Sequence, residues 1–138
     1  MVIFGDRTVT LFNREWNEET ETETWRATKL VNCGLTVVKS KGLSSGSGQT
    51  NSDSVTLLVD PAEQATEYVE PKEYATLEDK SNVYTFTPQI DFFVEGDISE
   101  EQTDNFFEYM LNKHNNVFKV TNYTEYKPIL PHLEIGGR

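Results

Sequence analysis

The side chains that most often bind metals are few and scattered in this sequence. The two histidines, His114 and His132, do not stand at the spacing of a metal motif, and the single cysteine, Cys33, is far from both along the chain. A structural zinc site needs four such ligands at short, paired spacings. We therefore predict no metal site and no cofactor. Because one cysteine cannot form an internal disulfide, we expect Cys33 to be a packed thiol in a reducing compartment.

Carboxylates gather in one segment that contains no lysine or arginine. A calcium loop needs oxygen ligands at regular short offsets around a glycine turn. Here an expected strand over residues 91–96 and then an expected helix interrupt the acidic run, so the pattern does not favour calcium. The acidic residues of this segment are Asp91, Glu95, Asp97, Glu100, Glu101, Asp104 and Glu108.

Nothing in the sequence has the pattern of a catalytic site. With twenty-three acidic residues, some carboxylates lie close together by chance, so a glycosidase pair has no support without a cleft. The serines of segment 42–46 lack the strand, sharp turn and helix of a nucleophile elbow. No lysine follows segment 46–48 at the spacing of a phosphate-binding loop. We therefore expect no catalytic residues and predict that the chain is not an enzyme.

Three aromatic residues, Trp16, Trp25 and Tyr84, could stack on the apolar faces of sugar rings. Trp25 begins a strong strand pattern, so core packing is its simpler interpretation. Trp16 lies among acidic residues in an expected hairpin, where an exposed tryptophan can anchor a protein interface. A carbohydrate- or protein-binding β module is therefore an alternative function, and an enzyme is a more distant one.

Length and charge restrict the remaining classes. A chain of 138 residues fits one domain, over 1–138, and eight Phe, six Tyr and two Trp can fill its core although only 36% of residues are hydrophobic. The formal net charge of −11 repels phosphate backbones and anionic membrane surfaces. The first residues do not resemble a signal peptide, and no segment is long enough to span a bilayer. We expect synthesis in the cytoplasm and no membrane partner.

Alternating polar and apolar residues predict a mainly β fold. The Thr/Glu alternation of residues 19–24 either extends a hairpin or stays mobile, and residues 32–34 are able to bulge the second strand. Pro71 begins a short helical turn. Ile90, Phe92 and Val94 are expected on one strand face. Six or seven strands predict a small barrel or sandwich, and the expected strands cover residues 8–13, 25–38, 54–59, 83–86, 90–96, 117–124 and 132–135.

One good helix is predicted, in the C-terminal half of the chain. Ser99 is its expected N-cap, Gln102 stands at the capping-box spacing, and the helix is expected to run to about Asn112. Its apolar stripe is expected to pack on the sheet, and the alternative is that Phe106 or Phe107 faces a neighbouring subunit. The stripe consists of Phe106, Phe107, Met110 and Leu111.

The order of these elements resembles the small head completion, or head-tail joining, proteins of tailed bacteriophages, including a group of prophage minor structural proteins. The resemblance spans nearly the whole chain and rests on loose hydrophobic patterns with a few prolines and glycines. The segments that carry it are VTLFNR (9–14), TW (24–25), KGL (41–43), YV (68–69), PKEY (71–74), FVEG (93–96), FKVT (118–121) and PHLEI (131–135).

The resemblance implies a β-barrel subunit of a ring between the portal and the tail of the virion, through which genomic DNA passes without sequence-specific contacts. The expected partners are further copies of this chain, the portal or adaptor, and tail proteins. Stopper-type members project a long loop into the channel, and the Gly- and Ser-rich residues 39–53 match a flexible inserted loop. The ring could also be an adaptor or tail terminator. The channel-loop candidates are Gly42, Leu43, Ser44, Ser45, Gly46, Ser47, Gly48, Gln49, Thr50, Asn51, Ser52 and Asp53, and the interface candidates are Trp16, Phe106 and Phe107.

Overall fold

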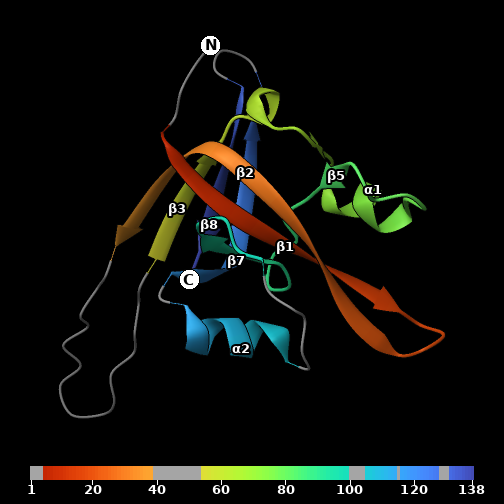
Figure 1. The fold of residues 1–138 in the computed structure, drawn as a ribbon. Coiled ribbons are helices and arrows are strands. Elements are labelled where there is room, and N and C mark those ends of the chain that lie inside the picture. Colours follow the sequence, from red (N-terminus) through yellow and green to blue (C-terminus); the bar gives the residue numbers. More distant parts are fainter. Residues whose placement is uncertain (1–4, 39–53, 100–104, 115, 128–130) are drawn as a thin grey trace.

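A computed structural model describes residues 5–38, 54–99, 105–114, 116–127 and 131–138. Six strands close into a barrel in the order β1-β2-β3-β8-β7-β6, and every neighbouring pair is antiparallel (Figure 1). The predicted mainly β fold is thus confirmed, as a barrel and not a sandwich. The barrel strands are β1 (Arg7–Asn17), β2 (Thr22–Val38), β3 (Ser54–Val59), β6 (Phe92–Glu95), β7 (Val117–Tyr126) and β8 (His132–Gly137).

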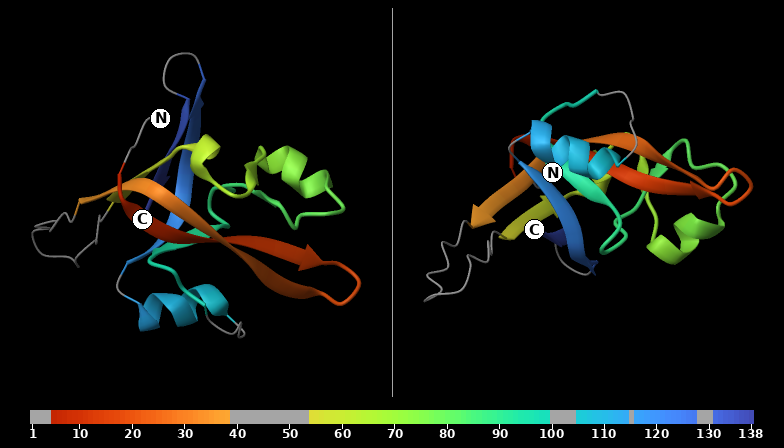
Figure 2. Two further views of the ribbon diagram at one scale, coloured as in Figure 1. Left: turned by 45° about the horizontal axis from the view of Figure 1, so that its top comes forward. Right: turned by 90° about the horizontal axis from the view of Figure 1, so that it is seen from below.

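The smaller elements lie outside the barrel wall. The 3-10 helix η1 (Pro61–Glu63) follows β3, and β4 (Glu67–Tyr68) pairs in parallel with β5 (Val83–Tyr84). The helix α1 (Pro71–Thr76), which confirms the helical turn expected from Pro71, lies beside this pair. The helix α2 (Phe106–Lys113) lies at the other side of the barrel, below it in Figure 1 and in front of it in the right-hand view of Figure 2.

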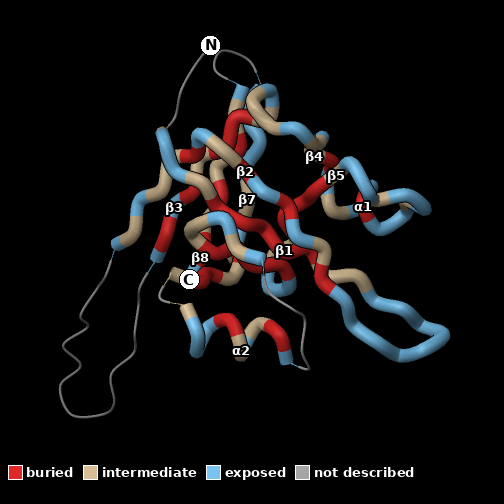
Figure 3. Tube along the Cα trace, in the orientation of Figure 1, coloured by how far each residue is buried: buried red, intermediate tan, exposed pale blue. Residues whose placement is uncertain are grey.

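Aromatic and branched side chains fill two adjoining cores. Because side chains alternate across a strand, Leu11 of β1 points into the barrel while Phe12 points out of it toward α2. The outer core contains Phe12, Trp25, Phe92 and Met110. Figure 3 shows buried stretches along the barrel strands and in α2. The expected burial of Trp25 is confirmed, and the inner core holds Cys33.

A bulge bends β2 so that one strand serves two sides of the barrel. Cys33 pairs with Arg7, but Leu30 pairs with Val9, so β2 carries one extra residue. Asn32 has a left-handed φ of 56° at this point. Beyond the bulge, β2 pairs with β3 from Gly34 onward. The bend expected at residues 32–34 is confirmed, and it provides the strong curvature that closing a small barrel requires.

The strand over residues 90–96 begins later than predicted. Ile90 lies in a turn in which the backbone N–H groups of Ile90 and Asp91 both donate to the Thr87 carbonyl. Gln89 has a positive φ of 67°, which is incompatible with an extended strand. Ile90 is therefore 37% exposed and does not share a strand face with Phe92.

The helix also begins later than predicted. Its N-cap is Asn105, with a φ of 54°, and not Ser99. A left-handed residue cannot lie inside a right-handed helix, so a continuous helix from Ser99 is excluded. The predicted cap partner Gln102 lies outside the described residues. Of the predicted stripe, Leu111 is 49% exposed, because Phe106 and Met110, four residues apart, define the face that packs on the barrel.

Candidate interaction surface

The β1–β2 hairpin extends away from the barrel and carries Trp16. In Figure 1 this hairpin projects to the lower right, beyond the other strands. Asn17 Oδ1 accepts hydrogen bonds from the backbone N–H groups of Glu19 and Thr20, at 3.0 and 3.3 Å, and these close the turn. The strand pairing reaches Asn17 and Thr22. Of the two alternatives for residues 19–24, the extended hairpin is therefore correct.

Trp16 lies on the hairpin surface, as predicted, with 51% of its area exposed. The Arg14 guanidinium lies 5.4 Å from the centre of the indole ring, a cation–π distance. Arg14 Nε also lies 3.4 Å from Glu23 Oε1 on β2. Trp16 thus has a cationic neighbour and a half-exposed side chain, and its role as an interface anchor stays a prediction.

Asp91 fixes the base of the hairpin. Its Oδ1 accepts the backbone N–H of Arg14 at 2.9 Å, and its Oδ2 accepts the Asn13 side-chain amide and the backbone N–H of Thr87, both at 2.8 Å. Asn13 Nδ2 also donates to the Thr85 carbonyl at 2.6 Å. Burial raises the pKa of Asp91, and the hydrogen bonds to its carboxylate oppose that rise. This acid is therefore structural, and its three donors occupy the oxygens that a cation would need.

A groove of about 1020 Å³ runs between the hairpin and α1. On its wall Arg26 Nε lies 3.0 Å from Glu15 Oε1. Tyr74 of α1 is buried beside this pair, and burial raises its pKa to about 12. Lys80 Nζ lies 5.3 Å from the Tyr74 ring centre. The lining of the groove mixes polar, charged and apolar side chains, and the charges of Arg26 and Glu15 on its wall are paired with each other.

The two phenylalanines predicted as interface candidates have different positions. Phe106 is only 2% exposed, because it packs on Phe12 and Phe92 with ring centres 5.3 and 6.0 Å apart. It is therefore a core residue and not an interface residue. Phe107 is partly buried, and Lys119 Nζ lies 4.5 Å from its ring centre. No contact that the structure describes joins Phe107 to Trp16.

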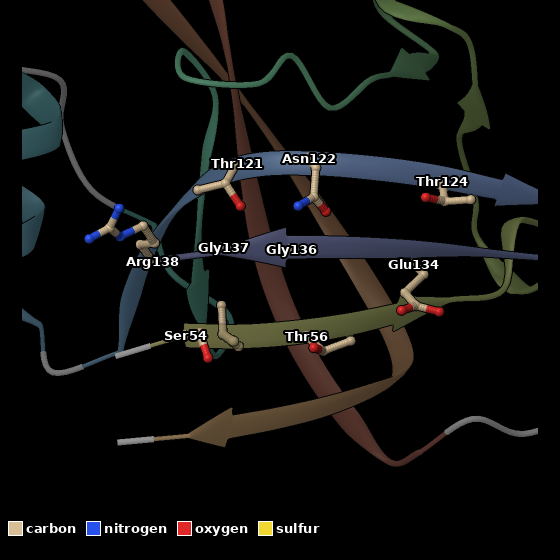
Figure 4. Close-up of a pocket in the computed structure, with 10 residues that line it drawn as sticks. Ser54, Thr56, Thr121, Asn122, Thr124, Glu134, Gly136, Gly137 and Arg138 are labelled. Atoms are coloured by element: carbon tan, nitrogen blue, oxygen red, sulfur yellow. The ribbon is translucent and has the colours of Figure 1, made fainter. Parts of the chain in front are cut away.

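A second hollow lies on the barrel surface across β3, β8 and β7 (Figure 4). It measures about 340 Å³ and is floored by Gly136 and Gly137. A Cβ atom built on Gly136 would lie 2.5 Å from Asn122 Oδ1, so a side chain at position 136 would displace this amide. Hydroxyls surround it, with Glu134 and Arg138 at its margin in Figure 4. The hollow was not predicted, since its residues are distant in sequence and share no motif.

The predicted channel-loop residues 42–53 lie outside the described residues. The strands at either end of their segment are paired with each other, with Val38 opposite Ser54. The segment thus connects β2 to β3, two neighbouring strands of the barrel, as the sequence indicated. The acids Glu100, Glu101 and Asp104 also lie outside the described part, whereas Glu95 is paired with Arg7 at 2.7 Å.

Other site classes have no support among the described residues. No group of three or more His, Cys, Asp or Glu side chains in this part of the chain is arranged to bind a metal ion. No helix within it combines the length and the apolar character that crossing a membrane requires. Burial raises the pKa of Cys33 to about 12, so its thiolate is disfavoured.

Comparison with known families places the chain in one family. A family model described as "Family of unknown function (DUF6751)" matches residues 4–138. The chain belongs to this family. No curated protein and no solved structure matches the chain. Membership of DUF6751 covers the whole barrel together with α1 and α2, but the family description assigns no activity.

Proposed function

We propose that this DUF6751 protein is a structural component of a tailed-phage virion. It forms a stopper-like head completion ring that connects the portal to the tail and helps to retain DNA. The observation that carries the proposal is the position of segment 39–53. It connects two adjacent strands of a closed barrel, the position that the resemblance to joining proteins assigns to a channel loop.

Charge and surface chemistry support the same proposal. A net charge of −11 suits the wall of a conduit, because DNA then passes without adhering. The buried acid Asp91 accepts three hydrogen bonds that join distant parts of the chain, which is a structural role and not a catalytic one. Trp16 on the projecting hairpin supplies an exposed aromatic anchor for a neighbouring protein.

The test is deletion of residues 42–53 in a phage that carries this gene. The segment is rich in glycine and serine, and loop-closure entropy changes by only about 0.6 kcal/mol per doubling of length. We therefore expect the shortened chain to fold with nearly unchanged stability. The particles should leak DNA or fail to join tails. If the deletion mutant kept full infectivity and retained its DNA, the loop would have no role in the neck and the stopper assignment would be wrong.

A binding module is the second candidate, and the exposed Trp16 beside the large groove favours it. In that case Trp16→Ala should abolish binding to an immobilised glycan or protein ligand. Deletion of residues 42–53 should then have no effect on virions. A tail terminator or another tail-tube component is a third possibility, distinguished by a position at the tail end of the neck.

A further inference from the structure

The groove between the β1–β2 hairpin and α1 is lined by two large apolar side chains that the protein exposes to solvent. Trp16 and Ile90 are both exposed, and both belong to the lining of this groove. In every view of Figures 1 and 2 the hairpin and α1 lie on the same side of the barrel. Exposed apolar side chains that line one hollow are typical of a surface that binds another molecule.

Hydrogen bonds fix the backbone around both of these side chains. Trp16 lies within the paired part of β1. Ile90 lies in the turn in which the N–H groups of Ile90 and Asp91 donate to the Thr87 carbonyl, at 3.2 and 3.0 Å. Asp91 accepts the Arg14 N–H at 2.9 Å, which joins this turn to the hairpin. A prearranged surface of this kind loses little conformational entropy when it binds a partner.

The basic side chains that line the groove already have partners within the chain. The two arginines, Arg14 and Arg26, lie 3.4 and 3.0 Å from glutamates of the same hairpin. Lys80 Nζ donates to the Leu77 carbonyl at 2.8 Å. An anionic partner would have to compete with these contacts, so the groove does not favour one.

The acids of the lining outnumber the cations that could neutralise them. Glu18 and Glu19 lie on the hairpin turn and Glu78 follows α1, so acids stand on both walls of the groove. All three are exposed, and none forms an ion pair with another described residue. Asp91 also lines the groove, but its oxygens accept three hydrogen bonds. The charge that remains for a partner is therefore negative, and lysine or arginine side chains complement it.

We propose that this groove is a docking surface for a segment of another protein that carries lysine or arginine beside a large apolar side chain. The apolar side chain packs on the exposed parts of Trp16 and Ile90. The cations lie against Glu18 and Glu19 on one wall and Glu78 on the other. That the partner is a neighbouring protein of the phage neck rests on the proposed function, whereas the chemistry of the contact rests on the groove.

A second copy of this chain is a poor occupant of the groove. At a net charge of −11, two copies repel each other. The same charge attracts a basic partner and raises the rate at which the two proteins meet. The occupant is therefore expected to be a different protein with a basic surface segment.

A random octapeptide library on beads, probed with the fluorescently labelled full-length chain, tests the chemistry of the occupant. We expect the peptides on labelled beads to combine lysine or arginine with leucine, phenylalanine or another large apolar residue. If no bead is labelled, or if the bound peptides are acidic or purely apolar, the proposal is wrong.

Two triple variants separate the groove from the general charge of the chain. One removes the three unpaired acids of the groove, and the other removes three acids that do not line it, so both change the net charge equally. The first should weaken binding of a selected peptide, measured by fluorescence anisotropy, by about tenfold, and the second by less than about twofold. Equal weakening would show unspecific attraction and overturn the proposal. The substitutions are Glu18→Gln, Glu19→Gln and Glu78→Gln in the first variant, and Asp6→Asn, Glu63→Gln and Glu67→Gln in the second.

The apolar part of the contact is tested by Trp16→Ala. Because Trp16 is half exposed, the variant should keep nearly the wild-type melting temperature while it binds the selected peptide about tenfold more weakly. Leu111→Ala removes a similarly exposed side chain on α2, outside the groove, and should bind as the wild type does. Unchanged binding by Trp16→Ala would mean that the peptide does not occupy the groove.

Sedimentation of the wild-type chain tests the alternative occupant. Self-association that the triple variant of the groove abolishes would identify a second copy as the occupant and overturn the assignment of a basic partner. Deletion of residues 42–53 tests the neck function separately, because that deletion leaves every residue of the groove in place. Peptide binding with intact virions would reject the neck function alone, and leaking virions without peptide binding would reject the docking surface alone.

Discussion

Single polar side chains hold together parts of the chain that are far apart in sequence. Asp91 connects β1, through Arg14 and Asn13, to the turn at Thr87. Gln64 connects η1 to β2 in a similar way. Because both side chains replace missing strand partners at ladder ends, they position the base of the projecting hairpin. Neither role was predicted: Asp91 was grouped with the acidic run, although its apolar neighbours Ile90 and Phe92 were a signal of burial.

Replacement of Asp91 by asparagine tests this role. The amide keeps one acceptor oxygen but places an NH₂ group against a backbone or side-chain donor. We expect Asp91→Asn to lower the free energy of unfolding by about 1 to 3 kcal/mol, because a buried donor loses its acceptor. Urea titration measures the loss. Asp97→Asn, at an exposed surface pair with Lys29, is the matched control and should change little; equal losses in both variants would contradict the structural role of Asp91.

Because the Cys33 thiol is buried, we predict that the stability of the fold depends on pH in the alkaline range. The pKa of this thiol is raised from 9.0 to about 12 in the folded chain by burial. An unfolded thiol therefore ionises first, so stability is intact below about pH 9 and decreases as the pH rises toward 12. Urea midpoints measured across this range should fall less steeply in Cys33→Ala than in the wild type. Identical slopes would show that the thiol does not contribute.

Trp25 and Trp16 provide a matched pair of tryptophans on one hairpin. Trp25 is buried against Phe92 at a ring-centre distance of 4.9 Å, whereas Trp16 is half exposed. Trp25→Ala should cost about 3 to 5 kcal/mol of unfolding free energy. Trp16→Ala should cost much less. A loss under about 1 kcal/mol for Trp25→Ala in denaturant titration would contradict its place in the core.

Whole elements attach to the barrel through a few side chains. The helix α2 contributes Phe106 and Met110 to the outer core, and both are almost fully buried. Its last turn exposes Leu111. The helix is therefore fixed by one narrow stripe, and a single charge in that stripe has no water or counter-ion to stabilise it.

Aspartate at neighbouring positions of α2 should have opposite effects on folding. Met110→Asp buries an unpaired carboxylate and should strongly lower the melting temperature. Leu111→Asp places the same carboxylate in solvent and should melt close to the wild type. Thermal unfolding followed by circular dichroism compares the two. A wild-type melting temperature for Met110→Asp would mean that this face does not pack on the barrel.

Local patterns predicted the elements better than their ends. Alternation located β2, β3, β7 and β8, because one side of each strand must face a core. The starts at Phe92 and Phe106 were missed because left-handed residues, Gln89 and Asn105, set them. Neither residue type identifies such a conformation from sequence. Barrel closure and the extent of the hairpin depend on which strands pair, and strand pairing joins residues too distant for a local pattern to indicate.

The whole molecule combines a closed barrel, a projecting hairpin and a long connection between adjacent strands. A closed barrel has no free sheet edges of its own. The β1–β2 hairpin extends beyond the pairing of β1 with β6 and of β2 with β3, so part of each of its strands has no described strand on the outer side. Under the proposed neck function, the hairpin that carries Trp16 is the expected contact to a neighbouring protein and the 39–53 connection is the expected channel segment.

The most direct test of the proposed neck function is an electron cryo-microscopy map of the head-tail junction of a phage that encodes this chain. The account predicts a ring of barrels between portal and tail, with the β2–β3 connection of each copy directed at the channel. A fully interpreted neck in which no copy of this barrel is found would contradict it.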